Sequence, residues 1–234
     1  KRTTLNTIKL NVLGLIIGFP MPIIFALLLS EIRNAAYKKV VQTVSYLPYF
    51  ISLVVVCGII KDFTSSNGVI TVIFEKLFNY NGSMPMLTKP DLFRPIFIAS
   101  DIWQNMGWSS IIYICAISSI NPELYEAATI DGAGRFRRVM NVTLPGISST
   151  IIMLLIFAMG NMMNVGLEKI LLLYNPTIYS SADVISSYVY RQGLETSMDI
   201  SYSAAVGIYN STINFILLLI SNKVAHKVSG TSLF

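Results

Sequence analysis

The sequence predicts an all-α protein, a polytopic bundle of helices that crosses a membrane. Composition is the first reason: 53% of the 234 residues are hydrophobic and only 12% are charged, whereas about 25% of the residues in a typical soluble domain are charged. Length is the second reason, because several apolar runs reach the roughly 20 residues that a helix needs to span a bilayer. Spans and short loops account for the whole chain, so residues 1–234 are predicted to form a single transmembrane domain in the lipid bilayer.

Five apolar runs are expected to form the spans, namely 5–30, 45–62, 95–120, 147–168 and 203–222. Pro20 and Pro22 lie inside the first run and are expected to kink it, because proline cannot donate the backbone hydrogen bond of an interior helical residue. Neighbouring helices can satisfy the carbonyl groups that proline leaves free, so a kinked helix can still span the membrane. The second run is the shortest, since Lys61 and Asp62 close it early.

A polar segment, residues 121–146, separates the third and fourth runs. Its first part is rich in Glu, Ala, Leu and Tyr, which favours a short helix. Gly132 favours the end of that helix, since glycine readily adopts the backbone angles that stop one. Arg135, Arg137 and Arg138 follow closely. Such a charged segment in an otherwise apolar protein is expected to face a partner.

This segment resembles the EAA loop of the permease subunits of binding-protein-dependent ABC importers. In that family Glu-Ala-Ala is followed by a glycine six residues after the glutamate, and later by an apolar residue and Leu-Pro. The resemblance covers residues 6–227, and the residues flanking the motif resemble the polysaccharide-type members of the sugar-uptake branch. Val142 takes the place of the commoner isoleucine. The matching residues are Glu126, Ala127, Ala128, Gly132, Val142, Leu144 and Pro145.

The resemblance implies the fold of a type I ABC importer permease, with about five spans here and a further N-terminal span missing ahead of Lys1. It implies a pathway subunit that takes up a carbohydrate, and the polysaccharide-type relatives favour an oligosaccharide. The implied partners are a second permease in a heterodimer, an ATPase dimer and an external sugar-binding protein. The chain is then no enzyme and binds no cofactor itself, because ATP and Mg²⁺ belong to the partner ATPase.

In the resembled family the EAA loop docks in a groove of the ATPase and passes its motion to the spans. Small residues at 127 and 128 would let a partner approach closely, and charges such as Glu126 and Arg135 could pair across the interface.

The segment lacks the Gly-Lys-Ser/Thr of a phosphate-binding loop, so no nucleotide site is predicted. The alternative is a solvated basic loop that only fixes the topology. The predicted ATPase-coupling residues are Glu123, Glu126, Ala127, Ala128, Asp131, Gly132, Ala133, Arg135, Leu144 and Pro145.

Charge indicates the orientation only weakly. Loops 31–44 and 121–146 and the C-terminal tail carry eight basic and four acidic residues, against eight and six in the longer segments opposite. The resemblance places the EAA loop and the C-terminus in the cytoplasm, and residues 63–94 and 169–202 outside, in a multi-pass protein of the cell membrane. Within the second external segment, 182–194 has the pattern of an amphipathic helix. That helix could meet a binding protein or lie at the membrane interface.

Polar side chains inside the predicted spans give the second functional signal, because such groups are costly in a membrane and commonly face a cavity or a partner. On the third span they recur at i, i+3, i+4 and i+7, which puts them on one helix face. On the fourth span, Asn161, Asn164 and Glu168 are expected to form a similar stripe. Carboxylates and amides suit the hydroxyls of a sugar, and indole rings suit its apolar faces. Alternatively these residues only tie helices together, as Gly14 and Gly18 would in a packing face. The predicted pathway residues are Asp101, Trp103, Gln104, Asn105, Trp108, Asn161, Asn164, Glu168, Asn210 and Asn214.

Two other classes of function stay open from the sequence. A self-contained secondary transporter or channel would predict internal repeats around an ion site, and no repeat is evident. A membrane-embedded enzyme would need a nucleophile–base pair or a metal cluster. The single histidine, His226, follows the last span, and Cys57 and Cys115 lie in apolar runs where cysteine acts as a small buried residue. No catalytic residue, metal site or nucleic-acid partner is therefore predicted.

Overall fold

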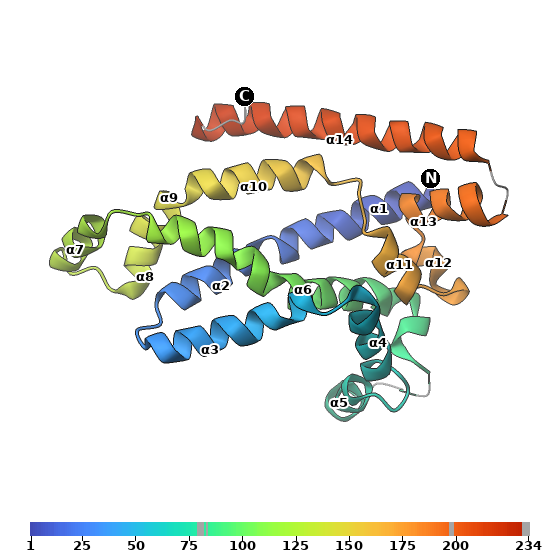
Figure 1. The fold of residues 1–234 in the computed structure, drawn as a ribbon, viewed down its shortest axis with the longest axis horizontal. Coiled ribbons are helices and arrows are strands. Elements are labelled where there is room, and N and C mark those ends of the chain that lie inside the picture. Colours follow the sequence, from blue (N-terminus) through green and yellow to red (C-terminus); the bar gives the residue numbers. More distant parts are fainter. Residues whose placement is uncertain (79–81, 83, 197–198, 231–234) are drawn as a thin grey trace.

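The computed structural model describes residues 1–78, 82, 84–196 and 199–230, and every regular element in these ranges is a helix. The all-α class is confirmed. Figure 1 shows an elongated bundle of long helices. The α-helices are α1 (Arg2–Leu13), α2 (Pro20–Ser30), α3 (Ala35–Tyr46), α4 (Leu53–Phe63), α5 (Val69–Phe78), α6 (Pro90–Ser118), α7 (Pro122–Ile130), α8 (Arg135–Arg138), α9 (Leu144–Gly146), α10 (Ser148–Gly160), α11 (Leu167–Leu173), α12 (Tyr179–Ala182), α13 (Ile185–Tyr190) and α14 (Ile200–Ser229).

The first span is a single helix of 29 residues, Arg2–Ser30, that accommodates its prolines. A π-helical segment, Gly14–Gly18, joins α1 to α2, and the Phe19 amide donates to the Gly14 carbonyl at 3.2 Å. This wider turn comes directly before Pro20, which has no amide hydrogen to complete an ordinary helical turn. The prolines therefore follow a π-helical segment, and the helix continues through them without a break.

The second span lies closer to the N-terminus than predicted. α3 continues through a 3₁₀ turn at Leu47–Phe50, and α4 then turns away by 100°. The predicted span 45–62 is therefore not one straight helix but is bent at residues 51–52, and the predicted loop 31–44 contains most of α3. The hydroxyl of Ser52 accepts the Val55 amide at 3.4 Å and so begins a new helix. For this reason the apolar run does not continue as one helix.

The remaining spans differ from the prediction at their ends. α6 and α14 begin earlier than predicted. α10 ends at Gly160, and a turn follows before α11 begins. Asn161, Asn164 and Glu168 therefore do not share a face of one helix, contrary to the prediction. Their spacing matches a helical period, but the chain leaves the helix at the first of them.

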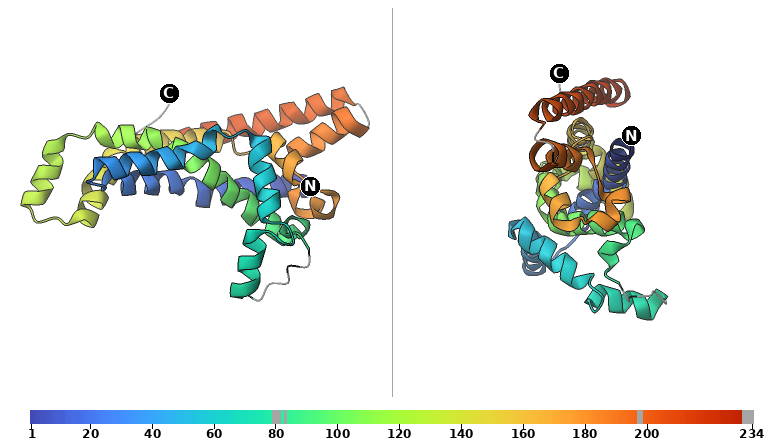
Figure 2. Two further views of the ribbon diagram at one scale, coloured as in Figure 1. Left: turned by 60° about the horizontal axis from the view of Figure 1, so that its bottom comes forward. Right: turned by 90° about the vertical axis from the view of Figure 1, so that its right-hand side faces the viewer.

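Helix α6 lies within the bundle and packs against α2, α3 and α12. α14 packs against α10 on one side, whereas α3, α4 and α5 lie on the opposite side (Figure 2). α7, α8 and α9 form one end of the molecule, and the N-terminus lies toward the other end with α4, α5 and α11–α13 (Figure 1). The predicted EAA-like loop and the predicted external segments thus lie at opposite ends.

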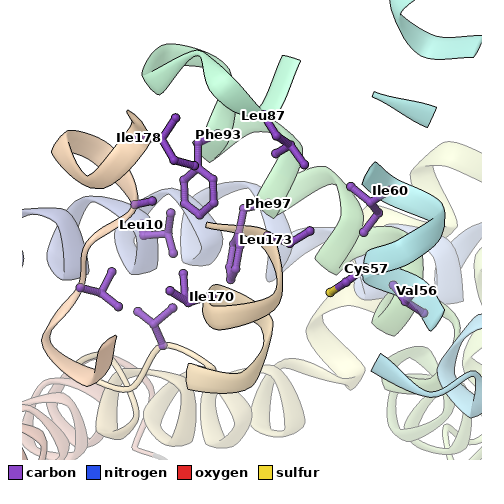
Figure 3. Close-up of a cluster of buried hydrophobic side chains, with 13 residues drawn as sticks. Leu10, Val56, Cys57, Ile60, Leu87, Phe93, Phe97, Ile170, Leu173 and Ile178 are labelled. Atoms are coloured by element: carbon purple, nitrogen blue, oxygen red, sulfur yellow. The ribbon is translucent and has the colours of Figure 1, made fainter. Parts of the chain in front are cut away.

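A cluster of buried hydrophobic side chains joins α6 to three other helices (Figure 3). The rings of Phe93 and Phe97, both on α6, lie with their centroids 5.7 Å apart. Side chains from α1, α4 and α11 pack with them, so this cluster fixes four helices against one another. Its labelled members are Leu10, Val56, Cys57, Ile60, Leu87, Phe93, Phe97, Ile170, Leu173 and Ile178.

A buried carboxylate, Asp183, anchors the first span to the segment between α12 and α13. Its side chain is 2% exposed, Arg191 donates to both of its oxygens at 3.0 Å, and Arg2 lies 3.8 Å away. Asn6 donates to the Asp183 carbonyl at 3.0 Å. Burial opposes the charge of Arg191, but its hydrogen bond and ion pair with Asp183 raise the pKa of the guanidinium above its ordinary value. The predicted amphipathic helix is present as α13, but it packs against α1 and has a buried face.

We expect Gly107→Ala to lower stability, because a Cβ at this position would overlap the backbone carbonyl of Ser45 where α6 crosses α3. Overpacking of this kind costs about 1–3 kcal/mol. Gly58→Ala in α4 is the matched control, since its Cβ would meet nothing within 4 Å and alanine is the better helix former by about 0.5–1 kcal/mol. Unfolding temperatures measured in detergent should fall for the first variant only. Equal temperatures would contradict the close packing of α3 on α6.

Candidate functional site

A cavity of about 750 Å³ lies between the first span, α6 and α10. Gly14 and Gly18 line it, and a Cβ on Gly14 would meet nothing within 4 Å. A Cβ on Gly18 would lie 3.8 Å from Ile102 of α6, which is ordinary contact, so neither glycine is needed for a close approach of helices. The polar and aromatic side chains in the lining are Asn11, Phe19, Asp101, Asn105, Trp108, Ser109, Tyr113, Asn161 and Asn164.

Helix α6 brings only part of its predicted polar face to the cavity. Asp101, Asn105 and Trp108 line it, and Asn105 donates to an Asp101 carboxylate oxygen at 3.2 Å. Gln104 is buried outside the lining, and Trp103, 43% exposed, also lies outside it. Asp101, Asn105 and Trp108 therefore meet at the cavity. Trp103 and Gln104 lie on other sides of the helix.

Trp108 is held in place by two aromatic neighbours from the end of the second span. Its ring stacks on Tyr49 with centroids 4.7 Å apart and an angle of 7° between the planes. Phe50 meets it edge-on at 5.4 Å. One face of the indole is thus covered by protein, so Trp108 is a rigid part of the wall.

The turn after α10 brings two amides to the cavity. Asn164 donates to Asn161 Oδ1 at 3.0 Å, and Asn210 on α14 donates to Asn164 Oδ1 at 3.0 Å. Asn214, which is buried, accepts the Met163 amide at 2.8 Å. Asn210 and Asn214 therefore tie α14 to this turn, which is the helix-tying role that was the alternative for such residues.

Lys169, which the sequence analysis did not single out, lies beside the cavity. Its ammonium is 3.2 Å from Asp101 Oδ1, and a smaller adjoining cavity of about 200 Å³ is lined by both residues. The neighbouring Glu168 is exposed in the first turn of α11, outside both cavities. A lysine placed directly before an apolar run was a signal available in the sequence, as was Asn11 inside the first run.

Helix α7 of the EAA-like loop has well-defined ends. At its start, Asn121 accepts the Glu123 amide at 3.1 Å. At its end, Ala133 donates to the Ala128 carbonyl at 2.9 Å and Gly132 donates to the Thr129 carbonyl at 3.0 Å. This pair of bonds is a Schellman motif, which needs a left-handed residue, and Gly132 has φ 74°. The predicted helix stop at Gly132 is confirmed.

Polar contacts brace this loop against the spans. The Tyr125 hydroxyl lies 3.0 Å from the Thr143 hydroxyl, and Arg138 donates to Thr129 at 3.2 Å. Arg135 Nε lies 4.0 Å from a carboxylate oxygen of Glu31, the residue that ends α2. The loop thus contacts both the segment before α10 and the end of the first span.

The outer surface of the loop is exposed and partly apolar. Ile130 is 86% exposed and Phe136 is 80% exposed. Of the residues predicted to couple to an ATPase, Ala128, Ala133 and Leu144 are half-buried and the others are exposed, including Glu123, Glu126, Ala127, Asp131, Gly132, Arg135 and Pro145. Large exposed apolar side chains beside charges are typical of an interaction surface.

Residues 18–230 match the family described as the binding-protein-dependent transport system inner membrane component. The chain belongs to this family. It is a multi-pass permease subunit of an ABC importer in the inner membrane, and ATP hydrolysis is carried out by a separate subunit. The match confirms the family that the EAA-like loop indicated, and it replaces the secondary-transporter, channel and membrane-enzyme alternatives.

Two relatives from Bacillus subtilis (strain 168) align over 230 residues, which is 98% of this chain and 71% of each relative. Protein LplB is 42% identical, and the polygalacturonan/rhamnogalacturonan transport system permease protein YteP is 40% identical. A crystal structure of a bacterial ABC transporter involved in the import of the acidic polysaccharide alginate matches with a TM-score of 0.92 and 43% identity, over 97% of this chain and 79% of that one. A second crystal structure, of the bacterial alginate ABC transporter in complex with an alginate pentasaccharide-bound periplasmic protein, matches with a TM-score of 0.93 and 42% identity, over 99% and 80%.

We expect Gly132→Ala to weaken the end of α7, because a left-handed backbone costs a residue with a Cβ about 1–2 kcal/mol. Gly134→Ala is the matched control: it lies two residues away, has φ −68° and leaves its Cβ in open space. Hydrogen exchange of the α7 amides should speed up in the first variant and stay unchanged in the second. Equal exchange in both variants would contradict the Schellman motif.

Proposed function

We propose that this permease forms half of the transmembrane pathway of an ATP-driven oligosaccharide importer, and that the cavity between the first span, α6 and α10 is its part of the pathway. The observation that carries this proposal is the lining, which joins the Asp101 carboxylate and four asparagine amides to the ring of Trp108. A sugar presents hydroxyl groups and apolar ring faces together, so this mixture suits it. The names of YteP and of the alginate importer support an oligosaccharide as the cargo.

In this proposal the pathway residues of the chain are those that line the cavity. Asp101, Asn105, Asn161 and Asn164 would meet the sugar hydroxyls, and Trp108 would support a ring face. Asn210 would not touch the sugar but would hold Asn164 in place through its hydrogen bond to that residue. The other predicted pathway residues lie outside the cavity and are not assigned to sugar contact.

Each end of the molecule is assigned a partner in this proposal. The surface of α7 and α8, with Ile130 and Phe136 at its centre, would dock in the ATPase, which binds ATP and Mg²⁺ and occurs as a dimer. A second permease would complete the pathway as a heterodimer, and a sugar-binding protein would dock at the end that carries the N-terminus. The EAA-like loop and the C-terminus would then lie in the cytoplasm. The complex of the alginate transporter with a periplasmic protein supports the binding-protein partner.

The proposed mechanism is alternating access. ATP binding closes the two ATPase subunits, and the docked loops follow them. Because Arg135 and Tyr125 link the loop to the end of α2 and to the segment before α10, movement of the loop reaches two walls of the cavity. The pathway then faces outward and receives the sugar, and hydrolysis returns it to the inward-facing state.

Uptake by the purified importer complex in liposomes tests this function, with the binding protein and a labelled pentasaccharide outside and ATP inside. We expect accumulation that requires both ATP and binding protein. Asn105→Leu should reduce it several-fold, because one amide of the cavity is lost. Thr212→Leu is the control, since its hydroxyl bonds only within α14 to the Ile208 carbonyl at 2.8 Å and lies outside the cavity. ATP-independent uptake, or equal loss in both variants, would refute the proposed pathway.

We expect the double variant Ile130→Ser with Phe136→Ser to lose its ATPase partner, because burial of two large apolar side chains contributes about 3–6 kcal/mol to an interface. Recovery of the ATPase with the tagged permease from mild detergent measures this loss. Phe63→Ser is the control, because Phe63 is 47% exposed and ends α4, a helix that lies away from the loop (Figure 1). Undiminished recovery by the double variant would show that this surface is not the docking site.

A further inference from the structure

Lys169 carries an ammonium group that the protein encloses almost completely. Its side chain is 4% exposed, and Nζ lies 3.2 Å from Asp101 Oδ1, 3.4 Å from the Phe97 carbonyl oxygen and 4.8 Å from the centre of the Phe97 ring. A buried charge is strongly unfavourable unless an opposite charge and hydrogen bonds compensate it. Asp101 is the acid that compensates Lys169, so the position of one residue depends on the other.

The two members of this ion pair have unequal surroundings. Asp101 is 54% exposed, and both the main cavity and the smaller one border it. Its Oδ1 accepts from Lys169 and from Asn105, each at 3.2 Å. Within the described residues no donor bonds to Oδ2. One oxygen of the carboxylate is therefore available to a molecule in the cavity.

We propose that Lys169 is a positioning residue of the pathway. Its bond to Oδ1 fixes the Asp101 side chain and leaves Oδ2 available at the cavity, where that oxygen accepts hydrogen bonds from the hydroxyls of the passing sugar. This inference rests on the proposed function and adds to it a residue from α11 that does not itself touch the sugar. It also assigns the contact between Asp101 and the sugar's hydroxyl groups to one oxygen of that carboxylate.

The charge balance of the pair fits this role. Because Lys169 cancels the charge of Asp101, the wall presents a strong acceptor without a net negative charge. A sugar unit that carries a carboxylate is then not repelled, whereas an uncompensated Asp101 would repel it. An ion pair that served only to join α6 to α11 would gain nothing from leaving one oxygen open to a cavity.

Exchanging Asp101 and Lys169 distinguishes a positioning role of Lys169 from a purely stabilising role of the ion pair. Asp101→Lys with Lys169→Asp keeps an ion pair between α6 and α11, but it places the ammonium at the cavity and the carboxylate in the enclosed position. Lys169→Met removes the ammonium group, with its charge and its hydrogen-bond donors, and keeps most of the length of the side chain. This variant should fold, because Asp101 can be hydrated from the cavity. Lys169→Arg is the conservative variant, and Glu168→Gln is the control, as Glu168 lies outside both cavities.

The measurement is pentasaccharide uptake by the importer complex in liposomes, with co-purification of the ATPase as the check on assembly. We expect Lys169→Met to lower the maximal uptake rate about tenfold, as for loss of an oriented charged acceptor, and Lys169→Arg to recover part of it. The exchanged pair should assemble but remain inactive, and Glu168→Gln should match the wild type.

Wild-type uptake by the exchanged pair or by Lys169→Met would overturn the inference and leave the proposed function standing. In the first case the ion pair would only join helices, and in the second it would be dispensable. Absence of ATP-driven uptake by the wild-type complex itself would instead refute the proposed function, and the inference with it.

Discussion

Asn214 on α14 accepts the amide hydrogen of Met163 at 2.8 Å, and the shape of the cavity depends on this bond. A helix can end inside an apolar bundle only where other groups take the backbone hydrogen bonds that it gives up. α10 ends directly before this turn, and α14 supplies the substitute through Asn214 and Asn210. Because the chain leaves the helix here, Asn161 and Asn164 reach the cavity and α11 can approach α6. The same contacts therefore hold the bundle together and create its polar wall.

The polar groups of the wall are supported from behind by protein. Asn164 is fixed by Asn210, and Trp108 by Tyr49. Asp101 is fixed by Lys169 of α11. Side chains held in this way lose little further freedom when a ligand arrives, so each hydrogen bond to a sugar would be less costly to form. The hydrophobic cluster around Phe93 and Phe97 gives α6 and α11 the rigidity that this arrangement requires.

The end of the molecule that carries α7 differs from the cavity wall in where its side chains lie. The backbone of α7 is closed by its own cap residues, while its large apolar side chains remain exposed. A rigid helix with an unburied apolar surface suits docking, since the shape is set before the partner arrives. Tyr125 of α7 contacts the segment before α10, and Arg135 of α8 contacts Glu31 at the end of the first span. Movement at this end can therefore reach the polar wall through short, identifiable contacts.

The sequence by itself determined the all-α membrane class, the family and the end of α7, because composition, the EAA-like motif and the backbone freedom of Gly132 are local properties. It predicted Asp101, Asn105 and Trp108 on one face, since they share an uninterrupted helix. It failed where the chain leaves a helix within an apolar run, at Ser52 and after Gly160, because hydrophobicity does not mark such breaks. Only the tertiary structure paired Lys169 with Asp101, which lies 68 positions earlier. That pairing depends on how α11 packs against α6, and no local pattern records it.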